Sequence, residues 1–162
     1  MNKFTVPDIC DEHGENIKIC DLFLNSYGKN DKFFGQVETA RCEHSNSVVK
    51  DLLAQNGSNK VLVIQHTGTE KCSMVGDQIA QMAYDNQWKG IITNGYIRDI
   101  EVIKDIPIGV YAKNSYPRKT DKSCGNGELG LTLEFENFMV QKNSWAYVDT
   151  NGIVFSEKEL EF

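Results

Sequence analysis

The chain has 162 residues, 40% of them apolar and 25% charged, a composition typical of one globular domain spanning residues 1–162 rather than of a disordered or fibrous chain. Its net charge of −6 argues against direct nucleic-acid binding, because neutralising phosphates requires a basic face. No apolar run approaches the ~20 residues of a membrane helix, and the amino-terminal residues lack a signal-peptide core, so we expect a cytoplasmic protein without a membrane partner.

The first elements in chain order are expected to be helix, strand and helix. Thr5-Val6-Pro7-Asp8 predicts a helix start, with a capping hydroxyl, proline in the first turn and an early acid. Residues 33–42 are rich in strand formers and follow a turn. The run from Ser45 to Ser47 is expected to cap a second helix over 48–54, which ends at Asn56-Gly57.

The middle of the chain alternates buried strands with a helix. Residues 60–65 form a continuous branched apolar run, which is typical of a strand covered on both faces. A helix is predicted over 76–88, with Ile79, Met82 and Ala83 on one face, and further buried strands over 90–93 and 106–112. This order of strand, helix and strand predicts parallel crossover units.

The final third changes to a period of two, which indicates strands joined by tight turns. Strands are expected over 131–135, 145–149 and 153–155, with a turn over 150–152. Together with the crossover core, they predict one α/β domain with more than one sheet layer.

Three groups of reactive side chains are interpreted as structural or exposed. The basic stretch over 117–122 is short and reads as a solvated loop. The histidines are scattered without ligand spacing: His13, His44 and His66. The cysteines are odd in number and form no C-x-x-C pair, so reduced, buried thiols are expected at Cys10, Cys20, Cys42, Cys72 and Cys124.

A first candidate cluster lies where the helix over 76–88 begins. Gly76 and Asp77 precede an apolar helical run, and the backbone N–H groups of a first helical turn have no partner within the helix. Such groups can bind a carboxylate or a phosphate. The alternative is that Asp77 is a capping acid and Gly76 a turn residue, which is the preferred interpretation for an isolated pair of this kind.

A second candidate cluster follows Gly95-Tyr96-Ile97, at the expected carboxyl end of a parallel strand. Arg98 and Asp99 are expected at the carboxyl edge of a parallel sheet, where ligands usually bind in α/β proteins. Arginine offers a planar fork to a substrate carboxylate or keto oxygen, and aspartate can hold a divalent cation such as Mg²⁺ or Mn²⁺ that keeps several waters. Taken alone, the pair is equally an exposed ion pair, with Asp99 capping the next element.

Together the clusters give G-D, twenty intervening residues and R-D, which resembles the D-x20-R-D signature of class II 4-hydroxy-4-methyl-2-oxoglutarate aldolases in the wider RraA-like family. Nearly the whole chain shares the resemblance, through TVPDICDEHG, FFGQVETARC and YVDTNGIVFSE. Its length and the runs LLAQNG, VLVI and NQWKGIITNGYIRD are most similar to the family's regulators of ribonuclease E activity.

The resemblance implies a fold, an assembly and a site. The fold would be a three-layer β/β/α domain of the swivelling type, assembled as a homotrimer with sites at subunit interfaces. The activity would be divalent-metal-dependent cleavage of a small 2-oxo acid to pyruvate, by aldol cleavage or by decarboxylation of oxaloacetate. Asp99 would bind the metal, Arg98 the pyruvyl group, and the backbone of Gly76, Asp77, Gln78 and Ile79 the substrate carboxylate. Asp77 would also serve as an acid or base through water.

The family contains a rival function, because its regulatory members can lack one or both aspartates. In that reading an acidic surface binds ribonuclease E or its helicase partners and no catalysis occurs. This chain has both aspartates but departs from the family's glycine-rich pattern at Gln65-His66-Thr67-Gly68, Glu136-Asn137 and Asn143-Ser144. A third alternative is therefore a retained fold whose altered loop over 65–68 blocks the site.

Overall fold

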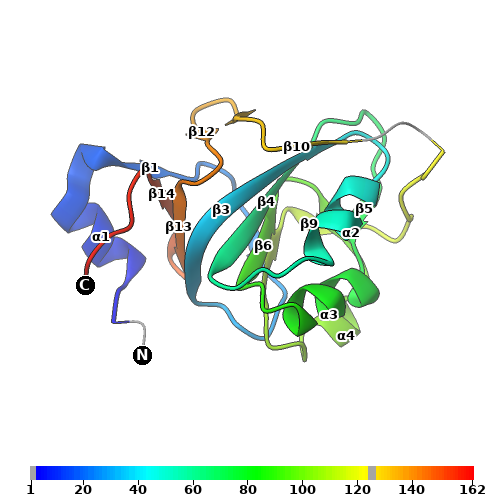
Figure 1. Ribbon diagram of the computed structural model, residues 1–162, viewed down its shortest axis with the longest axis horizontal. Helices are drawn as coiled ribbons and strands as arrows, with labels where there is room; N and C mark the ends of the chain where they lie inside the picture. Colours follow the sequence, from blue (N-terminus) through cyan, green and yellow to red (C-terminus); the bar gives the residue numbers. More distant parts are fainter. Residues whose placement is uncertain (1–2, 124–126) are drawn as a thin grey trace.

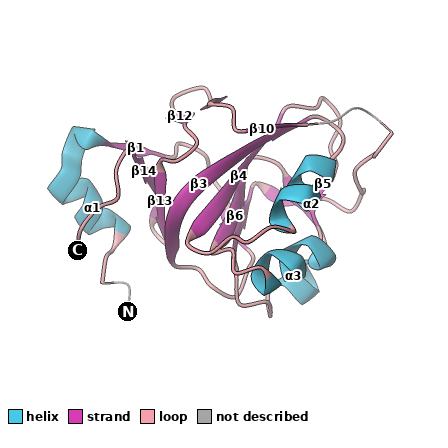
Figure 2. Ribbon diagram, viewed as in Figure 1, coloured by secondary structure: helices cyan, strands magenta, loops and turns pink. Residues whose placement is uncertain are grey.

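The computed structural model describes residues 3–123 and 127–162 and has a mixed α/β fold with one large sheet and few helices (Figures 1 and 2). The large sheet has the order β1-β14-β13-β3-β4-β6-β8-β2, and β10 pairs with β3. Its strands are β1 (Ile17–Ile19), β2 (Asn25–Ser26), β3 (Phe33–Cys42), β4 (Lys60–His66), β6 (Gly90–Thr93), β8 (Gly109–Ala112), β10 (Glu128–Leu129), β13 (Trp145–Asp149) and β14 (Gly152–Ser156).

The predicted parallel crossovers are confirmed in the centre of this sheet. Strands β3, β4, β6 and β8 are neighbours and run parallel. The branched apolar run of β4 is buried on both faces from Val61 to Ile64, which explains why it lacks an alternating pattern. The predicted turn after Asp149 joins β13 to β14 as an antiparallel hairpin.

Helices cover one face of the large sheet, as Figure 2 shows for α2 (Ser47–Leu53) and α3 (Asp77–Asp85), together with α4 (Ile100–Ile103). Side chains from these helices pack against alternate residues of the central strands, among them Leu62, Ile64 and Ile91. On the opposite face, Val61 and Val63 pack against residues of β13, β14 and the hairpin of β11 (Leu133–Glu134) and β12 (Met139–Val140). The central strands are therefore enclosed on both sides.

The amino-terminal helix forms as the sequence predicts. Helix α1 (Val6–His13) begins after Thr5, whose hydroxyl accepts the backbone N–H of Asp8. A short 3-10 helix, η1 (Gly14–Asn16), follows before β1. No helix in the described part of the chain is long and apolar enough to cross a membrane.

Several predicted boundaries are wrong by a few residues. Helix α3 ends at Asp85 rather than at residue 88, because the chain reverses at Gln87, whose φ is 71°. The strand predicted over 106–112 begins at Gly109, after a tight turn in which the Ile108 N–H bonds to the Ile106 carbonyl. The strand predicted over 131–135 retains only Leu133–Glu134.

The structure also contains a three-stranded parallel sheet that was not predicted from the sequence. It consists of β5 (Ser73–Val75), β7 (Tyr96–Ile97) and β9 (Asn114–Ser115), in the order β5-β7-β9. Strands of two or three residues are too short to display a periodic pattern, so no periodicity predicts them. This small sheet matters because both candidate clusters directly follow its strands.

The described cysteines are free thiols, as predicted, but the prediction that all of them are buried is wrong for Cys10 and Cys20, which are half-buried. Cys42 and Cys72 are buried, and burial raises the pKa of the Cys42 thiol to about 12. Burial also raises the pKa of Cys20 to about 11. A thiol held protonated in this way is a poor nucleophile at neutral pH. Cys124 lies outside the described residues.

Candidate functional site

The small sheet brings the two sequence clusters together. Strand β5 ends at Val75 and leads into Gly76 and α3, while β7 ends at Ile97 and leads into Arg98. Since β5 and β7 pair in parallel, their carboxyl ends meet at one edge, as expected for ligand sites in α/β folds. The Arg98 N–H bonds to the Val75 carbonyl at 3.0 Å and fixes this alignment.

The two aspartates of the site are linked directly. The Asp99 carboxylate accepts the backbone N–H of Asp77 through Oδ2 at 3.2 Å, so Asp99 caps α3 from a different part of the chain. Asp77 is therefore the first residue of the helix and not its capping acid. Asp99 also precedes α4, but its side chain makes no capping bond to that helix.

Local backbone geometry makes the contact between these aspartates achievable. Asp99 has φ 59° and ψ 38°, in the left-handed region that aspartate and asparagine adopt more readily than most residues. Gly76 leaves room for its carboxylate, because a Cβ atom at that position would lie 2.8 Å from Asp99 Oδ2. A glycine at position 76 and a left-handed aspartate at 99 are thus two parts of one arrangement.

Arg98 lies beside the same carboxylate. Its Nε atom is 3.9 Å from Asp99 Oδ2, and its Nη1 atom donates to the Pro117 carbonyl at 3.4 Å. The side chains of Arg98 and Asp99 are 40% and 35% exposed. An ion pair this exposed contributes little to stability, so its role is better sought in binding than in folding.

The clusters form the wall of a cavity of about 890 Å³. The site residues predicted from sequence all line it: Gly76, Asp77, Gln78, Ile79, Arg98 and Asp99. The N–H groups of Gln78 and Ile79 have no acceptor among the described residues and remain available at the start of α3. These two donors, with Arg98 nearby, suit a carboxylate ligand.

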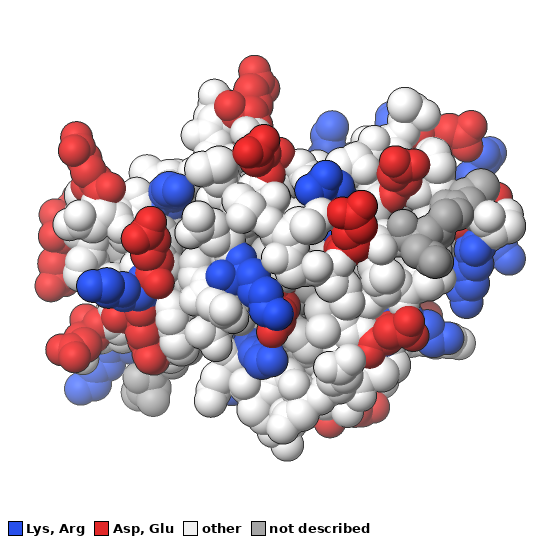
Figure 3. Space-filling model, turned by 45° about the horizontal axis from the view of Figure 1, so that its top comes forward, with Lys and Arg blue, Asp and Glu red and all other residues white. Residues whose placement is uncertain are grey.

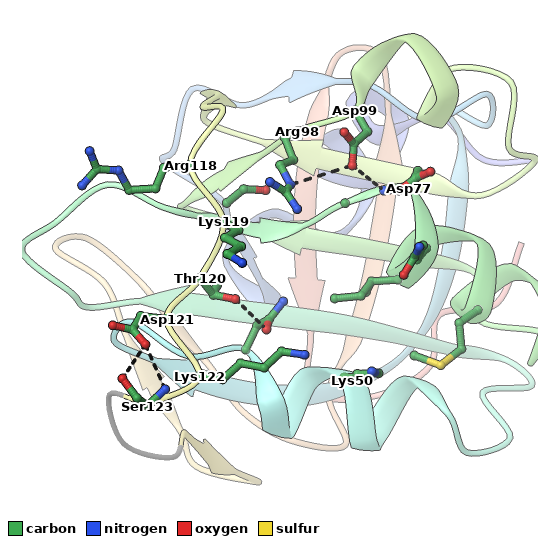
Figure 4. A pocket seen from close by; sticks show the side chains of 16 residues that line it. Lys50, Asp77, Arg98, Asp99, Arg118, Lys119, Thr120, Asp121, Lys122 and Ser123 are labelled. Carbon is green, nitrogen blue, oxygen red and sulfur yellow. Dashed lines mark hydrogen bonds and ion pairs between the residues drawn. The ribbon is translucent and has the colours of Figure 1, made fainter.

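The opposite wall of the cavity was missed in the sequence. It includes Asn46 and Lys50 of the α2 region and the segment 118–123 (Figure 4). The basic residues of that segment are exposed, as predicted, but two of them, Lys119 and Lys122, also face the cavity, whereas Arg118 points away from it (Figure 4). The sequence carries no signal for this wall, because the burial of Thr120 that anchors the segment appears only in the structure.

Asn46 connects this wall to the rest of the site. It was expected to help cap α2, yet its side chain makes no capping bond. Instead its amide donates to the Met74 carbonyl at 2.8 Å and accepts the Thr120 hydroxyl at 3.0 Å. The asparagine is buried and joins α2, β5 and the segment 118–123.

The altered loop over 65–68 does not line this cavity. His66 is half-buried, with Nε2 3.9 Å from Cys72 Sγ, and burial lowers its pKa. Its backbone N–H bonds to the Asn94 side chain at 2.7 Å. Within one protomer, the departure from the family pattern at this loop therefore leaves the cavity open.

The donor set suits a hard divalent cation. The described residues contain no group of three or more His, Cys, Asp or Glu side chains arranged to hold a metal. Two aspartates, Asp77 and Asp99, instead line the cavity. Mg²⁺ and Mn²⁺ bind through one or two carboxylates while keeping several waters, whereas zinc sites need more protein ligands.

Comparison with known proteins decides the family. The RraA-like (Aldolase/RraA) profile matches residues 6–155. The chain belongs to the RraA-like family. A relative from Vibrio vulnificus is 40% identical over 160 residues, covering 99% of both chains, and carries the provisional name 4-hydroxy-4-methyl-2-oxoglutarate aldolase. A Marinomonas protein with the same provisional name is 40% identical over 158 residues, covering 98% of both chains.

Two solved structures agree closely with the fold. The RNA-processing inhibitor RraA from Thermus thermophilis superposes with a TM-score of 0.92 at 26% identity, covering 98% of this chain and 96% of that one. A Geobacillus kaustophilus structure titled as an S-adenosylmethionine:2-dimethylmenaquinone methyltransferase has the same TM-score at 31% identity, covering 97% of both chains. The proteins to which this chain is similar thus bear three different functional names, so the activity must be argued from the site.

Proposed function

We propose that the protein is a divalent-metal-dependent lyase that cleaves a carbon–carbon bond of a small 2-oxo acid and releases pyruvate. The observation that carries the proposal is the Asp77–Asp99 contact beside Arg98 in the wall of the cavity. It places carboxylates, a guanidinium and free helix N–H groups together, which is the set of groups that a 2-oxo acid requires. The provisional aldolase names of the relatives support the same reading.

The chain's own residues would bind the pyruvyl end of the substrate. The N–H groups of Gln78 and Ile79 would bind its carboxylate at the start of α3, where the helix dipole favours an anion. The Arg98 guanidinium would donate to the keto oxygen and stabilise the negative charge that develops there. Asp99 would hold the cation, which when bound supplies charge neutralisation and polarises the 2-oxo group.

Asp77 is assigned the proton transfer. In 4-hydroxy-4-methyl-2-oxoglutarate, removal of the proton from the 4-hydroxyl group lets that oxygen form a ketone as the C3–C4 bond breaks. The electron pair passes to C3 and gives the enolate of pyruvate, which then takes a proton at C3. With oxaloacetate the same C3–C4 bond breaks with loss of carbon dioxide and leaves the same enolate, so one site serves both reactions.

The test is release of pyruvate by the purified protein. Oxaloacetate and 4-hydroxy-4-methyl-2-oxoglutarate are each supplied with Mg²⁺, then with Mn²⁺, then with a chelator in excess. We expect metal-dependent release above the spontaneous rate from at least one substrate. Release that is equal with and without protein, for both substrates and both metals, would reject the lyase.

A second candidate function is regulation of a ribonuclease, because a related structure is titled as an RNA-processing inhibitor. One observation favours it: acidic side chains gather at the end of the molecule that carries α1 (Figure 3), where exposed acids are Asp8, Asp11, Glu12 and Glu15. Such a surface suits basic protein segments. Binding to ribonuclease E should then be measurable at low salt and weaken steeply as salt rises, since exposed charges are screened over ~8 Å at physiological ionic strength.

We also propose a homotrimer as the working assembly. Support comes from large apolar side chains left exposed in the single chain, with Phe23 95% and Ile19 60% exposed. Sedimentation equilibrium at micromolar concentration should give three times the 18.3 kDa chain mass. A stable monomer would contradict this assembly.

A further inference from the structure

The chain contains four Asn-Gly pairs, of which one begins at Asn126, outside the described residues, and three are described: Asn56-Gly57, Asn94-Gly95 and Asn151-Gly152. At such a pair the glycine nitrogen can attack the asparagine side chain, because glycine has no Cβ to shield it. A bond forms from that nitrogen to Cγ, the Cγ–Nδ2 bond breaks, and ammonia leaves a succinimide ring. Water then opens the ring to aspartate or to isoaspartate, whose main chain runs through Cβ and Cγ. The attack requires a mobile side chain and a glycine N–H that is released from hydrogen bonding.

Hydrogen bonds hold both groups of the pair at Asn56. Its side-chain oxygen accepts the backbone N–H of Ser58 at 2.9 Å and the Ser58 hydroxyl at 2.8 Å. The Gly57 N–H donates to the Asn86 carbonyl at 2.8 Å. Attack by the Gly57 nitrogen would break all of these bonds, so the fold protects this pair.

The pair at Asn94 is held in the same way. The Asn94 side chain accepts the His66 backbone N–H at 2.7 Å and donates to the His66 carbonyl at 3.2 Å. The Gly95 N–H donates to the Thr93 hydroxyl at 3.0 Å, and Gly95 is buried. Because the side chain is bonded at both ends and the nitrogen is bonded and buried, this pair is protected as well.

The pair at Asn151 is different, because the Asn151 side chain is exposed and has no hydrogen-bond partner among the described residues. It lies in the two-residue turn between β13 and β14, where Gly152 faces Asp149 at the end of the ladder. Local opening costs least at such an end, so the Gly152 N–H is released more often than those of Gly57 and Gly95. A Cβ atom at Gly152 would have no heavy atom within 4 Å, so the surrounding space is open.

The same turn attaches the amino-terminal helix to the sheet. The buried Asp149 carboxylate accepts the Asn151 backbone N–H through Oδ1 at 2.7 Å and the Val6 N–H through Oδ2 at 2.8 Å. Val6 is the first residue of α1. Isoaspartate at position 151 would add one carbon to the main chain of the turn and a carboxylate near Asp149. The longer main chain displaces the N–H that Asp149 accepts, and the two carboxylates repel each other.

We propose that Asn151 is a site of spontaneous conversion to isoaspartate, and that the conversion weakens the attachment of α1 through Asp149. The product carries its free carboxylate on Cα. That group is the one that an isoaspartyl methyltransferase esterifies with the methyl group of S-adenosylmethionine, so the modified turn is a methyl acceptor for such an enzyme.

Incubation of the purified protein at mildly alkaline pH tests the modification. Mass spectrometry of peptides follows the exchange of NH₂ for OH at each pair, in folded protein and in protein unfolded by denaturant. Methyl uptake with an isoaspartyl methyltransferase distinguishes isoaspartate from aspartate. We expect similar rates at the three described pairs in the unfolded chain. In the folded protein, Asn151 should be converted about tenfold or more faster than Asn56 and Asn94. Equal protection of the three pairs by folding, or a converted Asn151 that accepts no methyl group, would overturn the inference.

The variant Gly152→Ala tests the route of attack. Its added Cβ shields the attacking nitrogen and has room in the structure, and φ at Gly152 is not positive, so the fold is retained. Conversion at Asn151 should slow about tenfold in this variant, while the rates at Asn56 and Asn94 stay unchanged. Conversion at the wild-type rate would show that the Gly152 nitrogen is not the attacking group and would overturn the inference.

Hydrogen exchange of the Val6 amide measures the attachment of α1. We compare unmodified protein, protein converted at position 151, and Asn151→Asp, which has the added charge without the added main-chain carbon. Exchange should be several-fold faster in the converted protein than in the unmodified protein, and intermediate in Asn151→Asp. Exchange at Val6 that is the same in converted and unmodified protein would overturn the link to α1.

Discussion

Asp99 accepts the backbone N–H of Asp77 at 3.2 Å, although the two residues are separated by 22 positions in the chain. The bond makes one carboxylate serve both the start of α3 and the wall of the cavity. It also holds the two sequence clusters in a fixed relative position, since neither aspartate can move without disturbing the bond.

Replacing Asp99 with asparagine should remove activity while sparing the fold. Asparagine also tolerates the left-handed backbone and caps a helix as well as aspartate does, so the Asp77 N–H keeps an acceptor. The lost negative charge is what would hold the cation. We expect Asp99→Asn to abolish Mn²⁺ binding by calorimetry and to reduce pyruvate release to background. Full metal-dependent activity in this variant would contradict the assignment.

Asp77→Asn should slow turnover without preventing binding. The contact to Asp99 uses the backbone of Asp77, so the substitution leaves that bond intact. Loss of a positioned acid or base typically costs ~10²- to 10⁴-fold in rate. Steady-state kinetics should show the fall in kcat, and calorimetry should show unchanged Mn²⁺ and pyruvate affinity. A parallel loss of metal binding would instead make Asp77 a ligand.

Arg98→Lys should weaken substrate binding while metal binding survives. Lysine keeps the positive charge but lacks the planar fork that can donate to two oxygens at once. Arg98 also donates to the Pro117 carbonyl, a bond that lysine would not reproduce in the same geometry. Calorimetry should show a lower pyruvate affinity, and steady-state kinetics a lower kcat/KM. As the control, Mn²⁺ affinity in the absence of ligand should be unchanged. Unaltered kinetics would remove Arg98 from the substrate site.

Gly76→Ala tests the space around the Asp99 carboxylate. The added Cβ would lie 2.8 Å from Asp99 Oδ2, so the carboxylate must shift, although the backbone φ of −113° suits alanine. Gly152→Ala is the matched control, because a Cβ there has no heavy atom within 4 Å. We expect weaker Mn²⁺ binding and lower activity for Gly76→Ala alone. Equal behaviour of the two variants would mean that the Asp99 position is not critical.

The burial of His66 should make stability depend on pH. Burial lowers its pKa from the ordinary value of 6.5, so the folded state disfavours the protonated ring. As the pH falls below 6.5, the unfolded chain therefore binds more protons at this histidine than the folded chain does. The free energy of unfolding contributed by neutral His66, which is complete above pH 6.5, is lost as the pH falls. Denaturant unfolding at about pH 7.5 and about pH 5.5 should show a larger drop in the wild-type protein than in His66→Gln. An identical drop in both would refute the prediction.

Much of the central sheet could be predicted, because its strands are long apolar runs and such runs predict burial on both faces. Strand β3 matches its predicted bounds, and β4 extends one residue beyond its own. The sequence also singled out the turn at Gly76 and the pair at Arg98, which the structure places in the wall of one cavity.

The relations between these residues could not be predicted, since they depend on pairings across the chain. The bond of Asp99 to α3 requires the alignment of β5 with β7, and neither strand has a detectable period. The contact of Thr120 with Asn46 spans 74 residues. Without that contact, the basic stretch over 117–122 looks like any solvated run of charge.

The twenty residues between Asp77 and Arg98 are the length of chain that leaves the site and returns to it. The chain leaves the site along α3, reverses near Gln87, and returns through β6 and β7 to within one hydrogen bond of where it started. Both ends of this excursion are anchored at the same sheet edge, while the reversal lies at the other end of α3. A residue inserted at the reversal would change the spacing in the sequence but leave Asp77, Arg98 and Asp99 in the same positions. Homologues with longer returns would thus escape a search by spacing while keeping the bond from the Asp77 backbone to the Asp99 carboxylate.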